Sequence, residues 1–144
     1  MKKKVAIILS LSFLFLLAGL ISCTKKKAPD TPFTRIQGNW RKVKYATDDN
    51  NNGRIEGSEI HLVPSTLDDE IFFTNEETGQ ETTVSNGVTS VPLKFVWKIV
   101  GGDSVWVAYR ANDTVTYAIT AVSSHDLQLS ANTQFGLASY YYVK

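Results

Sequence analysis

Residues 35–144 are predicted to form an all-β domain, an antiparallel up-and-down barrel of about eight strands. Apolar residues in this region recur at every second position, which is the period of half-buried strands. Short turn sequences separate the runs, and no stretch has convincing helical periodicity. About eight strands are enough to close a barrel. A β-sandwich is the competing architecture, but sequential hairpins without a long crossover favour the barrel.

Before this domain, residues 1–22 have the layout of a secretory signal peptide and are predicted to form its helix. Three lysines follow Met1 and precede an apolar run over 5–21, which is at the short end for a membrane-spanning helix. The run leads into Leu20-Ile21-Ser22-Cys23, which resembles the lipobox of bacterial lipoproteins. The resemblance implies that Cys23 is lipidated and begins the mature chain. The alternative is an uncleaved N-terminal anchor.

Residues 23–34 are predicted to be a disordered tether, because the lysines at 25–27 repel one another and Pro29 and Pro32 favour extended backbone. Thr24 replaces the aspartate that retains enterobacterial lipoproteins at the inner membrane, so the resemblance implies the outer membrane. The richness in Asn, Thr and Tyr resembles Bacteroidetes lipoproteins. Their surface-exported members carry acidic residues after the cysteine, whereas this tether is basic, so we expect the periplasmic face of the cell envelope.

The early strands of the domain are predicted at 40–45, 70–74 and 80–85. The last two flank the turn residues 75–79, and Asn86-Gly87 is a strong hairpin signal. The later strands show the clearest alternation. Leu93, Phe95, Trp97 and Ile99 share one face of a strand that a Gly-Gly-Asp turn joins to the next. The predicted later strands are 93–100, 104–110, 114–121, 126–130 and 137–143.

The first strand opens with Ile36-Gln37-Gly38-Asn39-Trp40, a Gly-x-Trp sequence that resembles the opening motif of lipocalins. The pieces 68–73, 95–99, 117–119 and 127–129 follow in matching order, so the domain resembles the lipocalin-like domains of secreted bacterial lipoproteins. For Gly38 and Trp40 the resemblance implies a structural role at the closed end of the barrel.

Aromatic residues of the later strands are the candidate ligand-binding groups, and we select Phe95, Trp97, Tyr109 and Tyr117. With Trp106 and the tyrosines at 140–142 they could line an apolar pocket for a small hydrophobic ligand. They could equally fill the barrel, as side chains often do in small barrels, or form an interface with another envelope protein.

A twelve-residue loop between the first two strands fits the calcium-loop pattern. Oxygen-bearing side chains stand at positions one, three and five, glycine at six and glutamate at twelve. Ca²⁺ prefers six to eight oxygen ligands, which this spacing turns inward. The alternative is a polar turn that needs no metal. The predicted ligands are Asp48, Asn50, Asn52, the Arg54 carbonyl, Glu56 through water and Glu59.

Composition argues against several other classes. The single cysteine excludes an intramolecular disulfide, and residues 35–144 carry nine basic and thirteen acidic residues, a formal charge of −4, which argues against nucleic acid as a partner. His61 and His125 lie apart, and Ser124-His125-Asp126 are consecutive, so catalysis is not expected. The sequence therefore predicts a non-catalytic, membrane-anchored, lipocalin-like lipoprotein that binds a small hydrophobic ligand. The alternative is a structural or interaction subunit of an envelope complex with a filled barrel.

Overall fold

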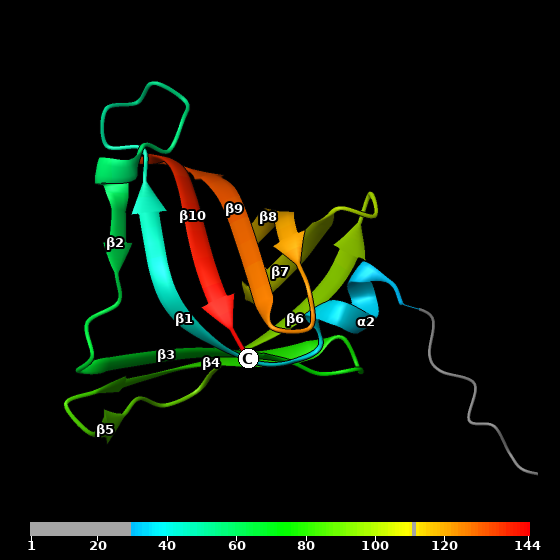
Figure 1. Ribbon diagram of the computed structural model, residues 1–144. Helices are drawn as coiled ribbons and strands as arrows, with labels where there is room; N and C mark the ends of the chain where they lie inside the picture. The colour runs from blue at the N-terminus through cyan, green and yellow to red at the C-terminus, as the bar shows by residue number, and fades with distance from the viewer. Residues whose placement is uncertain (1–29, 111) are drawn as a thin grey trace, which may run out of the picture.

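The computed structural model describes residues 30–110 and 112–144. The predicted signal peptide, Cys23 and residues 24–29 of the predicted tether lie outside the described residues. Regular structure is almost entirely β (Figure 1). The elements are α2 Pro32–Ile36, β1 Gly38–Thr47, the 3-10 turn η1 Gly57–Glu59, β2 Ile60–Leu62, β3 Leu67–Phe73, β4 Thr78–Ser85, β5 Val88–Thr89, β6 Leu93–Val100, β7 Ser104–Arg110, β8 Asp113–Val122, β9 Asp126–Thr133 and β10 Gly136–Val143.

Eight of these strands close an antiparallel barrel, which confirms the predicted fold class. The strand order is β10-β9-β8-β7-β6-β4-β3-β1, and β10 also pairs with β1 to complete the ring. The closing pairs run from Arg41 opposite Val143 to Thr47 opposite Ala138. Two short strands lie outside the ring, because β2 pairs with β1 and β5 pairs with β4. Neither was predicted, since three and two exposed residues carry too little pattern.

The period-two pattern separates interior from exterior side chains as expected. In β6, Phe95 and Trp97 are buried, whereas Val96 and Lys98 are exposed. Turn chemistry also follows the sequence, because Gly101 and Gly102 adopt positive φ between β6 and β7. Asn86 and Gly87, with φ of 50° and 80°, join β4 to β5. A two-residue hairpin turn of type I′ requires positive φ at both of its central residues.

Helix α2 corrects one part of the sequence prediction. Residues up to 34 were expected to belong to a disordered tether, yet the structure forms a helix from Pro32. Thr31 and Thr34 cap it reciprocally, and proline suits the first helical position because its missing N–H has no helical partner there. Phe33 and Ile36 pack against the core, so tertiary contacts stabilise a helix too short to form alone. No helix among residues 30–110 and 112–144 is long and apolar enough to span a membrane.

The barrel widens away from α2 because two strands, β1 and β4, change partner along their length. Strand β1 pairs with β3 over Gly38–Arg41 but with β2 over Lys44–Ala46. Strand β4 likewise pairs with β6 over Thr78–Glu81 and then with β5. The β3–β4 pair consequently diverges from the upright wall of β1, β10 and β9 (Figure 1). The ring is therefore tight near α2 and flared at the other end.

Candidate functional site

The tight end of the barrel is filled by its own side chains. Trp40, Trp97 and Phe73 are each at most 1% exposed. Phe33 from α2 stacks on Trp97 with ring centroids 5.1 Å apart, and Phe73 meets the same indole edge-on at 5.2 Å. The indole N–H of Trp40 donates to the Ile36 carbonyl at 2.6 Å. This half of the interior is hydrophobic core, and it contains Trp40 of the Gly-x-Trp motif. Gly38 is half-buried at the start of β1, with φ 118°.

A cavity of about 220 Å³ lies farther up the barrel interior. Its walls are half-buried polar side chains, in contrast to the aromatic and aliphatic base. The side chains that face the core and those that face the cavity follow one another along the same strands. Lys42 lies two residues after Trp40, and Glu81 lies two residues after Gly79, so each pair faces the same side of its strand. The groups that give the cavity its character are Lys42, Asp69, Glu81, Tyr109, Tyr117, Tyr140 and Tyr142.

Glu81 is the central acid of this cavity. The Tyr109 hydroxyl donates to its Oε1 at 2.5 Å. Burial raises the pKa of Glu81, while the hydrogen bond from Tyr109 and the charge of Lys42 act in the opposite direction. Burial and the nearby Glu81 charge raise the pKa of Tyr117 to about 12, and they also raise the pKa of Tyr109 and Tyr142. These three tyrosines are therefore neutral hydrogen-bonding groups at physiological pH.

Lys42 and Asp69 form an ion pair on the neighbouring wall, with Nζ and Oδ2 2.6 Å apart. Burial by itself would raise the pKa of Asp69, but hydrogen bonds from Lys42 and Thr83, with the charge of Lys42, lower it overall. The lysine ammonium also lies 5.8 Å from the centroid of the Tyr140 ring. Lys42, the lysine among the described residues that line the cavity, is thus paired with Asp69.

The structure divides the four predicted ligand-binding residues between two places. Tyr109 and Tyr117 line the cavity, whereas Trp97 belongs to the packed base. Phe95 is 4% exposed and packs edge-on against Tyr109 with centroids 5.6 Å apart, at the boundary between core and cavity. Sequence reasoning missed Lys42, Asp69 and Glu81. Their signal was register, since Lys42 and Asp69 each stand two residues from a buried side chain, Trp40 and Ile71, and Glu81 stands two residues from Gly79.

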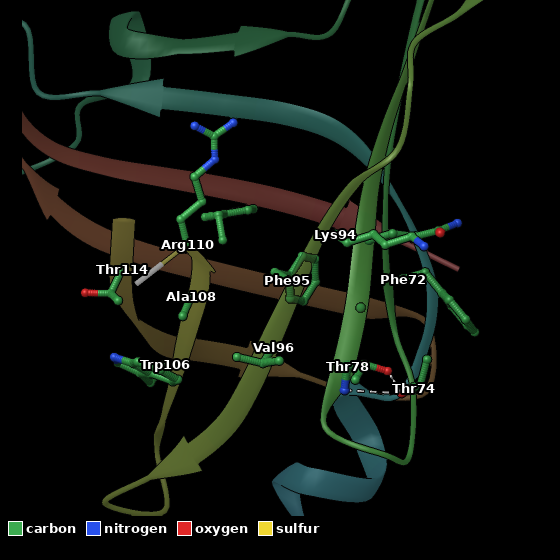
Figure 2. A pocket seen from close by; sticks show the side chains of 13 residues that line it. Phe72, Thr74, Thr78, Lys94, Phe95, Val96, Trp106, Ala108, Arg110 and Thr114 are labelled. Atoms are coloured by element: carbon green, nitrogen blue, oxygen red, sulfur yellow. Dashed lines mark hydrogen bonds between the residues drawn. The ribbon is translucent and has the colours of Figure 1, made fainter. Parts of the chain in front are cut away.

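A second depression lies on the outside of the barrel, where β6 and β7 diverge (Figure 2). These strands pair from Val96 opposite Ala108 to Val100 opposite Ser104, and their remaining ends separate. The groove has a volume of about 820 Å³, and Lys94 and Arg110 stand on either side of it. Tyr109 contributes to both this groove and the inner cavity, so it lies in the wall between them.

The predicted calcium loop joins β1 to β2, and its two end carboxylates are buried. Asp48 is 2% exposed and accepts from the backbone N–H groups of Asn52 at 3.0 Å and Gly53 at 2.7 Å. Glu59 is 5% exposed and accepts from the Asn50 amide at 3.0 Å and the Glu56 N–H at 2.8 Å. These hydrogen bonds fold the loop around both acids.

The other predicted ligands of this loop are exposed. The Asn52 amide donates to Glu56 at 2.9 Å, and the Arg54 N–H donates to the Asn52 side-chain oxygen at 2.9 Å. The structure thus joins these predicted ligands through one network of hydrogen bonds. In the part of the chain that the structure describes, no group of three or more His, Cys, Asp or Glu side chains is arranged to hold a metal ion. A cation here would depend on amide and carbonyl oxygens as well as carboxylates.

The consecutive Ser124-His125-Asp126 lies at the β8–β9 turn, as its sequence suggests. The His125 Nδ1 lies 2.6 Å from the Ser124 hydroxyl, while the Asp126 carboxylate pairs with the Ser123 hydroxyl at 3.2 Å. All these residues are exposed. Their hydrogen bonds therefore close a surface turn.

Comparison with solved structures finds similarity to a lipocalin allergen, an odorant-binding protein and a pheromone. The bovine lipocalin allergen Bos d 2 is 21% identical with a TM-score of 0.47, over 78% of this chain and 75% of the allergen. A bovine odorant-binding protein in complex with a selenium-containing odorant is 16% identical with a TM-score of 0.43, over 74% and 71%. Aphrodisin, a sex pheromone from female hamster, is 16% identical with a TM-score of 0.39, over 74% and 71%. No family model matches the chain, and no curated protein gives a significant match. The closed barrel of this chain is established by the pairing of its own strands, including β10 with β1.

The raised pKa of Glu81 predicts how stability depends on pH. As pH rises, the unfolded chain ionises this carboxyl first, so the folded state loses stability between the ordinary pKa and the raised one. Above the raised pKa, the folded state carries the full free-energy cost of holding the charged Glu81 carboxylate in a buried position. Glu81→Gln keeps the shape and an acceptor for Tyr109 but removes the charge. We expect its melting temperature to exceed that of the parent at pH 8, with the difference vanishing towards pH 4.

Thermal unfolding of both proteins across this pH range measures the effect. Glu76→Gln is the matched control, because Glu76 is an exposed residue of the β3–β4 turn. A Glu81→Gln protein that is equally or less stable than the parent at every pH would contradict the desolvation of Glu81.

Proposed function

We propose that this chain is a non-catalytic, lipocalin-like binding protein that takes a small ligand into the flared half of its barrel. The observation that carries the proposal is the cavity of about 220 Å³ above a solid base. Pockets for drug-sized ligands usually measure roughly 300–1,000 Å³, so the ligand should be compact. Tyrosine rings offer it apolar contact, and the polar groups between them offer it orientation.

The alternative, an interaction subunit with a filled barrel, has support from the base alone. Trp40 and Trp97 are fully buried in that half, within a cluster of apolar side chains. The polar cavity favours the binding function, because half-buried acids and hydroxyls around a cavity contribute nothing to hydrophobic packing. The two functions therefore differ in one measurable property, which is saturable binding inside the barrel.

We expect 2-phenylethanol, a compact aromatic alcohol, to bind the full-length chain with one saturable site in isothermal titration calorimetry. Thr83 lines the cavity, so Thr83→Phe should fill the space and weaken binding by about tenfold or more. Val96→Ser alters the outer groove and should leave binding unchanged. Circular dichroism establishes that both variants fold. Absence of saturable heat in the parent protein, or loss with Val96→Ser alone, would count against the proposal.

We propose further that Cys23 carries the lipid anchor and holds the domain at the outer membrane, facing the periplasm. The support is the lipobox-like sequence at 20–23 after an apolar run. Several acyl chains on one residue anchor a protein firmly, because each buried methylene contributes about 0.8 kcal/mol. Cys23→Ala should move the protein from the membrane fraction to the soluble fraction on cell fractionation. Thr24→Ala is the control that should stay with the membrane, and retention of both proteins would disprove lipid anchoring.

A calcium-ordered loop is the last part of the proposal, supported by the burial of Asp48 and Glu59 at the two ends of the motif. With a dissociation constant near 1 mM, 10 mM Ca²⁺ should add about 1.4 kcal/mol and raise the melting temperature by roughly 6 °C. Glu59→Gln should abolish the rise, whatever its effect on the metal-free protein. The same concentration of Mg²⁺ serves as the control, and a parent protein that ignores Ca²⁺ would refute the metal site.

A further inference from the structure

The charge of the cavity wall is unbalanced. Among the described residues that line it, one is a lysine and three carry carboxyl groups, Asp69, Glu70 and Glu81. Lys42 is held by Asp69 at 2.6 Å, so its charge is largely used within that pair. Glu70 lies at the side of the cavity, on the strand position between Asp69 and Ile71. Within the described residues, Glu81 is the acid that faces the cavity without a salt bridge to a cation.

The hydrogen bond to Glu81 comes from a neutral group. Tyr109 donates one hydroxyl proton to Oε1, which satisfies part of the carboxylate but supplies no positive charge. A carboxylate has two oxygens and about four acceptor sites, so Glu81 keeps capacity for further donors. A half-buried anion with spare acceptor capacity is complementary to a cationic hydrogen-bond donor.

Tyrosine rings surround this acid from several strands. Tyr117 and Tyr140 meet edge-on with centroids 6.1 Å apart, and Tyr142 and Tyr109 complete the aromatic wall. The faces of such rings attract cations, and Tyr140 already has the Lys42 ammonium 5.8 Å from its centroid. An acid among tyrosine rings thus offers two attractions to one positive group, together with apolar contact for the rest of a ligand.

We propose that the cavity binds a small organic ammonium ion with an aromatic body, whose charged nitrogen donates to the Glu81 carboxylate. The inference rests on the proposed binding function and adds the sign of the ligand's charge. The ammonium would supply the positive charge that the cavity wall lacks, while its ring would pack against the tyrosines. An anionic ligand of the same size would meet the carboxylates instead.

Three probes of nearly equal shape test the sign: phenethylamine as the cation, 2-phenylethanol as the neutral form and phenylacetate as the anion. Calorimetric titration of the full-length chain in detergent should give a dissociation constant for phenethylamine about tenfold below that for 2-phenylethanol, and still weaker binding of phenylacetate. Glu81→Gln should remove the advantage of the amine and leave the alcohol unchanged. Glu76→Gln, with the same loss of charge on an exposed turn, should leave all three affinities unchanged.

A pH series on the parent protein supplies a second measurement that needs no variant. A primary ammonium ion stays charged between pH 4 and pH 8, so its affinity should fall as Glu81 is protonated at low pH. Lys42, Asp69, Tyr109, Tyr117 and Tyr142 also face Glu81. The tyrosines stay neutral over this range, and the lowered pKa of Asp69 places its titration below that of Glu81.

The outcomes separate the two proposals. Equal binding of the three probes, or tighter binding of phenylacetate, would overturn the ammonium inference while leaving a binding barrel. A preference for phenethylamine that survives in Glu81→Gln would also overturn it. Failure of every probe to bind would overturn the binding function itself, and the inference with it.

Discussion

The burial of Trp40 is the constraint on which the rest of the barrel depends. Its indole N–H is bonded to the Ile36 carbonyl, which fixes α2 against the start of β1. The Lys144 ammonium lies 4.3 Å from the centroid of the indole and donates to the Gln37 carbonyl at 2.8 Å. One side chain therefore links the helix, the first strand and the end of the last strand, at the seam where β1 pairs with β10. Removing such a ring from a core typically costs about 3–5 kcal/mol.

A solid base allows the flared half to carry groups that oppose folding. A half-buried carboxylate such as Glu81 costs stability, because burial disfavours its charged form. The ring packing around Trp97 lies in the tight half, and Tyr109 connects the two halves, because its ring packs on Phe95 and its hydroxyl donates to Glu81. Strands β1 and β4 each exchange one partner for another along their length. The barrel wall therefore opens in the half where Lys42, Asp69 and Glu81 lie. The apolar side chains that stabilise the fold thus lie mainly in the tight half of the barrel, and the polar side chains that line the cavity lie in the flared half.

The sequence predicted the barrel better than its site, for a physical reason. Strands β6 and β7 bury alternate residues and are joined by glycines at positive φ, so local pattern specifies them. Lys42, Asp69 and Glu81 have the same inward register, but a charged residue at one inward position is indistinguishable in sequence from a lapse in the alternation. Helix α2 has only five residues and depends on contacts with β6 and β8, which no periodicity reports.

The position of α2 also bears on how the domain would face a membrane. The described chain begins at Asp30, beside the solid end of the barrel, whereas the cavity lies in the flared half. Cys23 lies seven positions before Asp30, and an extended chain of seven steps spans at most about 25 Å. With the anchor proposed at Cys23, the solid end would lie near the bilayer and the cavity would open towards the aqueous side. Such an orientation suits a ligand that arrives from water, which agrees with a binding site built from carboxylates and phenols rather than from aliphatic side chains.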